Sequence, residues 1–146
     1  NLEMANLYLE KSMKDLKRAQ TKGGTLLGYI LVNLSDVYIL KNDLKKARRY
    51  LNKSEIIFKK GNDLEGLAGT EFNKSLLFAQ MGEKEKAHCH FQLSEKIAYP
   101  LPWEYQREER RKVFKGRMIE NGLQVDEKVF IHPPWTRENP GNTYNP

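Results

Sequence analysis

The stretch that decides the fold is Leu44-Lys45-Lys46-Ala47-Arg48-Arg49-Tyr50-Leu51-Asn52-Lys53-Ser54. Its Leu, Ala, Tyr, Leu, Lys and Ser recur 42 residues earlier, in the segment that begins at Leu2 and ends at Ser12. The chain therefore contains an internal repeat, and a repeat has to be recognised before any single element is interpreted. A weaker copy follows 40 residues later, where the matches are Lys46-Ala47 with Lys86-Ala87, Leu51 with Phe91, Ser54-Glu55 with Ser94-Glu95, and Ile57 with Ile97.

The segment before each of the two later copies repeats as well. In its first occurrence, Leu27, Leu31 and Leu34 recur at intervals of three and four, as the apolar face of a helix does. A period of about 40 residues that holds two amphipathic helices predicts a stack of helical hairpins. The matched positions of this segment are Asn33 with Asn73, Ser35 with Ser75 and Tyr38 with Phe78.

Glycine and proline residues divide the chain into six predicted helices. Gly23-Gly24 and Gly61-Asn62-Asp63 supply breaks, and Pro100 and Pro102 end the fifth helix. Asp43 is placed to cap a helix, because its carboxylate can accept the free N–H groups of the first turn. Small side chains at Ala47 and Ala87 are expected where the two helices of a hairpin cross. The predicted helices are 2–21, 25–40, 43–60, 64–81, 83–98 and 103–121.

These repeats resemble the tetratricopeptide repeat family over residues 1–100. The family pattern is a small residue, an aromatic residue, a polar turn, an alanine, a large apolar residue and a second small residue. The first copy keeps only the second half of this pattern, at Leu2, Ala5, Leu9 and Ser12. The complete copies read Ser35, Tyr38, Asn42-Asp43, Ala47, Leu51, Ser54, and then Ser75, Phe78, Gly82-Glu83, Ala87, Phe91, Ser94.

The resemblance implies an all-α fold, a right-handed α–α superhelix with a tetratricopeptide-like solenoid over residues 1–100. Two features depart from the family: the period exceeds the usual length of about 34 residues, and Glu71 and Lys74 stand where apolar residues are usual. The polar segment 101–122 is expected to be a capping helix. An extended or irregular, Pro-rich tail is expected over 123–146. Because the sequence does not start with Met, we expect the C-terminal part of a larger protein.

Composition and charge narrow the class of protein. The 146 residues contain 25 Lys and Arg against 19 Asp and Glu, a formal net charge of +6. No apolar run approaches the roughly 18 residues of a membrane-spanning helix, so no membrane partner is expected. A single cysteine, Cys89, excludes an intramolecular disulfide, and no signal peptide is visible. We therefore expect a cytoplasmic, intracellular protein.

No motif in the sequence indicates catalysis. Gly23-Gly24 is followed by no lysine, so it does not form a phosphate-binding loop. The run His88-Cys89-His90 lies on a predicted helix, where adjacent side chains point about 100° apart and do not converge on one ion. The same divergence argues against a Cys–His nucleophile. We predict no enzyme, no catalytic residue, no metal site and no cofactor.

The resemblance also implies a partner-binding groove. In tetratricopeptide superhelices the first helix of each repeat lines the concave face, and an asparagine there often bonds the backbone of a bound peptide. Asn33 and Asn73 fall at that position. We predict a protein–protein interaction scaffold that holds a partner peptide or helix, although some of these residues could instead pack against the neighbouring repeat. The further predicted groove residues are Tyr29, Val32, Asp36, Phe72 and Leu76, flanked by Ile39 and Gln80.

Two other functions stay open at this point. The repeats could form the sensor or regulatory module of a signalling NTPase or a transcription regulator. The lysines and arginines over 41–60 and 107–117 could attract a nucleic acid, with salt-dependent affinity, or an acidic protein, although a solvated surface explains them equally well. Trp135 and Tyr144 of the tail could anchor it to the repeats or to a partner. The oligomeric state and the identity of the partner are left open.

Overall fold

The computed structural model describes residues 1–18, 24–99 and 104–130, and in these ranges the protein is all-α, without a strand. Where both ends are described, the helices agree with the sequence-predicted ranges to within one residue. No helix in the described ranges has the length and apolar character needed to span a bilayer. The helices are α1 (Leu2–Arg18), α2 (Leu26–Leu40), α3 (Leu44–Lys60), α4 (Leu64–Gln80), α5 (Lys84–Ala98) and α6 (Glu104–Glu120), followed by the 3-10 turn η1 (Glu127–Phe130).

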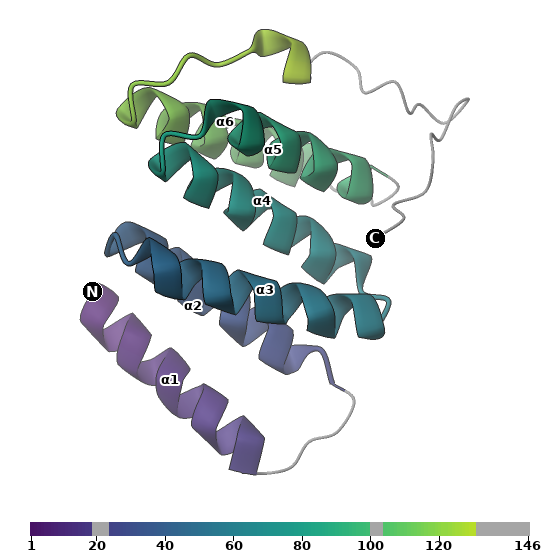
Figure 1. Cartoon of the computed structure of the whole chain (residues 1–146). Coiled ribbons are helices and arrows are strands. Elements are labelled where there is room, and N and C mark those ends of the chain that lie inside the picture. Colours follow the sequence, from purple (N-terminus) through teal and green to yellow (C-terminus); the bar gives the residue numbers. More distant parts are fainter. Residues whose placement is uncertain (19–23, 100–103, 131–146) are drawn as a thin grey trace.

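The six helices form a repeat-like row in which neighbours pack on one another (Figure 1). Helices α2 and α3 form one antiparallel hairpin, and α4 and α5 form the next. Helix α4 also contacts α2 on one side and α6 on the other, so α2, α4 and α6 follow one another in a single layer. Helix α1 lies at one end of the row, against α2.

The turns that follow α2, α3 and α4 share one backbone feature, a residue with positive φ. Asn42 after α2, Asn62 after α3 and Gly82 after α4 all have positive φ, at 61°, 51° and 76°. Asparagine and glycine tolerate this left-handed conformation, which ends a helix. An aspartate then caps the following helix in two cases: Asp43 Oδ1 accepts the Lys46 N–H at 3.2 Å, as predicted, and Asp63 Oδ1 accepts the Gly66 N–H at 2.9 Å.

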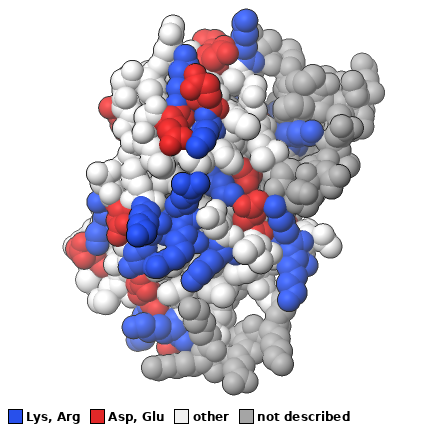
Figure 2. Space-filling view, in the orientation of Figure 1, with Lys and Arg blue, Asp and Glu red and all other residues white. Residues whose placement is uncertain are grey.

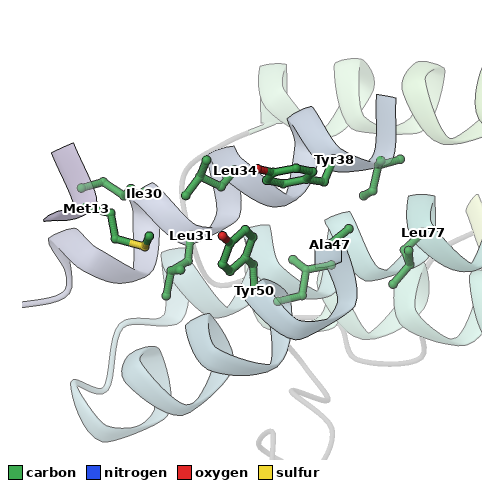
Figure 3. Close-up of a cluster of buried hydrophobic side chains, with 10 residues drawn as sticks. Met13, Ile30, Leu31, Leu34, Tyr38, Ala47, Tyr50 and Leu77 are labelled. Atoms are coloured by element: carbon green, nitrogen blue, oxygen red, sulfur yellow. The ribbon is translucent and has the colours of Figure 1, made fainter. Parts of the chain in front are cut away.

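The first core joins α1, α2 and α3, and it includes Leu77 of α4 (Figure 3). Ala47 is completely buried there, as is Ala87 in its own hairpin. The rings of Tyr38 and Tyr50 lie 5.6 Å apart, and both hydroxyls donate to Glu10 Oε1, at 3.0 and 3.2 Å. These two bonds attach α1 to the α2–α3 hairpin.

The second core shows that α6 is more than a polar cap. Phe114 and Met118 are completely buried, and the Phe114 ring stacks on Phe91 of α5 with centroids 4.3 Å apart. Beyond α6, the chain packs back on this core through partly buried residues that include Val129 and Phe130. Residues 123–130 thus contain the turn η1 where the sequence analysis expects extended or irregular chain, and Trp135 and Tyr144 lie outside the described residues.

Candidate partner-binding groove

A cavity of about 380 Å³ lies where α2, α4 and α6 meet. Ala68 and Gly69 of α4 are buried or half-buried at its base, while the side chains of Glu65, Gln106 and Glu109 are exposed. The cavity therefore combines an apolar base with a polar rim, as ligand sites commonly do. Its lining residues are Tyr29 from α2; Glu65, Ala68 and Gly69 from α4; and Gln106, Glu109 and Arg110 from α6.

Gly69 differs from Gly28 and Gly66, the other glycines within α2 and α4. A Cβ atom on Gly28 would lie 2.7 Å from the Phe58 ring, and one on Gly66 would clash with the same ring, so packing requires glycine at both positions. A Cβ atom on Gly69 would meet nothing within 4 Å. Glycine in a helix interior is less stable than alanine by about 0.5–1 kcal/mol. Packing thus gives no reason for Gly69, which leaves the backbone of α4 bare at the base of the cavity.

Tyr29 forms a fixed wall of this cavity. Its hydroxyl donates to Asp63 Oδ2 at 2.8 Å, and its ring packs edge-on against Phe58 with centroids 4.8 Å apart. Burial, together with the hydrogen bond to Asp63 and that residue's negative charge, raises the pKa of the Tyr29 hydroxyl above its usual range. The ring is therefore held in place by contacts at both ends, and its hydroxyl stays protonated.

The two asparagines predicted to bind a peptide backbone occupy different environments. Asn73 is 8% exposed, and its Nδ2 donates to Val32 O at 3.2 Å and to Ser35 Oγ at 3.3 Å. This side chain connects α4 to α2. Asn33 is exposed and has no side-chain hydrogen bond to any described residue. Of the pair, only Asn33 has its donor and acceptor groups available.

The other predicted groove residues divide in the same way. Leu76 is buried, and Val32 and Phe72 are partly buried against the apolar clusters around Phe58 and Phe91. Asp36 is half-buried; burial raises its pKa, and the positive charge of Arg117 opposes that rise. The structure therefore gives Leu76 a packing position and leaves Asn33 exposed and Asp36 half-buried, and neither of these two residues lines the cavity.

Gln80 links the three helices of this layer. Its Nε2 donates to Ile39 O at 2.8 Å and to Asn42 Oδ1 at 3.0 Å, both at the end of α2. Its Oε1 accepts from Arg117 Nη1 of α6 at 3.2 Å. The side chain flanking the predicted groove is thus a positioning bridge, which holds α2 and α6 at fixed distances from α4.

The contribution of α6 to this site was not predicted from the sequence. Residues 101–122 were expected to form a cap, although the repeat spacing of 40 residues takes Tyr29 to Gly69 and Gly69 to Glu109, and all three line the cavity. The same spacing takes Phe78 to the buried Met118. Extending the repeat by one more step was the signal that would have found these residues.

The arginines of α6 are not simply a solvated face, as the sequence analysis allowed. Arg107, Arg110 and Arg111 approach the buried carboxylate of Glu95, at N–O distances of 3.7, 3.6 and 3.4 Å. Burial lowers the pKa of Arg110, and the charge of Glu95 opposes that shift. Arg110 therefore enters the cavity wall with its charge partly balanced, while Glu65 and Glu109 carry exposed carboxylates at the rim.

The polar residues that depart from the family pattern form a buried network between α3, α4 and α5. Lys74 contacts Glu55 and lies 3.5 Å from Glu71 Oε1, and Glu71 Oε2 lies 2.6 Å from His90 Nδ1. His88 is not part of this network, because its Nε2 accepts the Asp126 N–H at 2.9 Å. The two histidines therefore diverge, and no three His, Cys, Asp or Glu residues of the described ranges are grouped to hold a metal.

Most of the positive charge lies away from the cavity. Helix α3 carries seven lysines and arginines and one acidic residue, and Figure 2 shows lysine and arginine side chains gathered over it. Some of these groups have structural partners: Lys46 Nζ donates to the Tyr38 hydroxyl at 2.8 Å, and the Arg48 guanidinium lies over the Phe78 ring at 5.7 Å. The Phe78 ring is buried, so it offers no stacking surface to a nucleic-acid base.

No family model, curated protein or solved structure matches the chain. The geometry and the charge of these residues are therefore the basis for any functional conclusion.

Proposed function

We propose that the chain is a tetratricopeptide-like solenoid, a right-handed superhelix, that recognises a partner protein through the layer formed by α2, α4 and α6. The observation that carries this proposal is the open space above Gly69, at the base of a cavity that three repeat-related helices line. The activity is recognition rather than catalysis, and the partner presents a peptide segment or a helix.

The chemistry of the cavity indicates what the partner offers. Its volume of about 380 Å³ falls within the range of about 300–1,000 Å³ typical of ligand pockets. The base formed by Ala68 and Gly69 suits an apolar side chain, and the Tyr29 ring supplies a rigid apolar wall. The exposed carboxylates of Glu65 and Glu109 suit a lysine or arginine next to that side chain. The bare backbone at Gly69 lets the partner approach closely.

A steric block tests this proposal. Random peptides displayed on phage are selected against the whole chain, and a selected peptide is titrated by calorimetry into the unmodified protein and into Gly69→Leu. The Cβ of the leucine enters open space, because a Cβ at this position meets no atom within 4 Å; an unchanged midpoint of thermal unfolding for Gly69→Leu shows that the fold is kept. We expect a loss of affinity of at least about tenfold, or 1.4 kcal/mol.

Asn52→Leu is the matched control, because it adds the same side chain at an exposed position of α3 outside the cavity lining. Its affinity should equal that of the unmodified protein. Selected peptides that bind Gly69→Leu as tightly as the unmodified protein would contradict the proposal.

The basic surface of α3 supports one alternative function, association with a nucleic acid. Lys45, Arg49 and Lys53 are exposed on this helix, and Figure 2 shows lysine and arginine side chains gathered over it. Such binding releases counterions, so its affinity would fall steeply as salt is raised from about 50 to 200 mM. A fluorescently labelled DNA or RNA duplex, titrated at both salt concentrations, tests this alternative. Recognition of a peptide at the cavity, by contrast, would be weakened by Gly69→Leu.

A further inference from the structure

Helix α1 repeats the residues through which α3 contacts α2, but in α1 no described helix packs over them. Leu2, Ala5, Tyr8, Leu9 and Ser12 of α1 are identical to the residues 42 positions later in α3. In α3, Ala47 is completely buried and Tyr50 is 5% exposed. In α1, the equivalent Ala5 is exposed and Tyr8 is 74% exposed. We call Met4, Ala5, Leu7 and Tyr8 the Tyr8 face.

The Tyr8 face is exposed although α1 is packed against the rest of the molecule. Leu9, Met13 and Leu16 on the other side of this helix pack into the first core. Glu10 accepts hydrogen bonds from Tyr38 and Tyr50, and Lys41 Nζ pairs with Glu3 Oε1 at 3.0 Å. Helix α1 is thus docked at the end of the row (Figure 1), and its second apolar side is exposed.

The α2–α3 hairpin shows what covers such a face. Leu34 and Tyr38 of α2 belong to the same buried cluster as Ala47 and Tyr50 of α3, and the Tyr38 and Tyr50 rings lie 5.6 Å apart. A small residue at the alanine position lets the two helix backbones approach closely. The Tyr8 face offers the same alanine and the same ring in the same register.

We infer that the Tyr8 face is a docking site for an amphipathic helix of the α2 type, which lies antiparallel to α1. Such a helix presents a leucine and, four residues later, an aromatic ring, as Leu34 and Tyr38 do in α2. The leucine packs beside Ala5 and the ring packs against Tyr8. Met4 and Leu7, which are 62% and 66% exposed, extend the contact at its edge. This surface is separate from the cavity at Gly69, so either proposal can fail while the other stands.

The test grafts the proposed partner onto the whole chain. A second copy of residues 25–43 is inserted before Leu2 in place of Asn1, so that an aspartate precedes Leu2 as Asp43 precedes Leu44. Repeat arrays gain stability from each added nearest-neighbour contact. We expect the midpoint of thermal unfolding to rise by roughly 5 °C or more, and Tyr8 to become protected from nitration by tetranitromethane.

Ala5→Lys supplies the matched control. In the ungrafted chain this exposed substitution should leave the midpoint unchanged, whereas in the grafted chain it should abolish the rise, because the lysine blocks close approach of the helices. A graft that raises neither the midpoint nor the protection of Tyr8 would overturn the inference, as would a rise that survives Ala5→Lys. Dimerisation of the ungrafted chain in sedimentation, lost with Ala5→Lys, would overturn it by showing a second copy as the occupant.

Discussion

Two glycines on neighbouring parts of the α4 surface, Gly66 and Gly69, contrast sharply in their surroundings. The side that faces α3 and α5 is closely packed: the Phe58 ring occupies the space above Gly66, and Lys74 and Glu71 form a buried ionic network. Gly69, three residues later and on the neighbouring part of the same helix surface, meets open space beside α6. The same residue type thus serves packing at one position and an accessible surface at the other, and substitution at each position separates these two roles.

The largest effect is expected from Lys74→Ala. This substitution leaves Glu71, which is almost completely buried, without its lysine partner. Breaking a buried ion pair from one side commonly costs about 3–5 kcal/mol, and the lower end applies here because His90 Nδ1 still lies 2.6 Å from Glu71 Oε2. We expect the free energy of unfolding to fall by about 3 kcal/mol, measured by urea denaturation. Lys74→Ala with Glu71→Gln should recover part of the loss; a single variant as stable as the unmodified protein would contradict the role of this network.

Gly66→Ala is expected to have the next largest effect. The added methyl group has no room, because a Cβ there overlaps the completely buried Phe58 ring. Overpacking of this kind typically destabilises by about 1–3 kcal/mol. Urea denaturation of Gly66→Ala should show a loss in that range, and Phe58→Leu introduced with it should reduce the loss. An unchanged midpoint would show that the ring moves aside without cost.

Gly69→Ala should have the opposite sign. The methyl group enters open space, so the gain in helix propensity of about 0.5–1 kcal/mol is not opposed by a clash. We expect a small increase in the free energy of unfolding, by the same denaturation measurement. If Gly69→Ala instead destabilises the chain, the glycine has a packing role, and the contrast between Gly66 and Gly69 disappears.

The smallest effect concerns pH. The folded-state pKa of Asp36 is raised by burial, so its ionised form is disfavoured in the folded protein at neutral pH. This cost is fully present above the folded-state pKa and disappears as the pH falls towards the unfolded-state value. Asp36→Asn should therefore be slightly more stable than the unmodified protein at pH 7, with the advantage shrinking in acid. An advantage that is constant from pH 7 to about pH 3 would contradict the burial of this carboxyl.

The helices were predictable from the sequence because local signals determine them. Asp43 caps a helix through its own first turn, and Ala47 and Ala87 mark crossings by their size alone. The pairing of Arg110 with Glu95 depends on how α6 rests on its neighbours, which no local pattern encodes. The donors of Asn73 are likewise directed by the approach of α2.

The cavity was only half predictable. Tyr29 follows from the repeat register. Gly69 has no side chain from which a binding role could be predicted. The charged sequence of α6 indicated a solvent-exposed cap and not a cavity wall. The register that relates Tyr29, Gly69 and Glu109 was present in the sequence all along, yet it becomes meaningful only when the three helices are seen side by side.

The most direct test of the account is to locate the partner on the molecule. Amide chemical shifts of the whole chain, recorded by NMR during titration with a phage-selected peptide, report which residues it contacts. The account predicts that the largest shifts cluster at Ala68, Gly69 and Arg110, while Asn52 and Lys53 of α3 stay unchanged. Shifts centred on α3, with Gly69 unaffected, would contradict it.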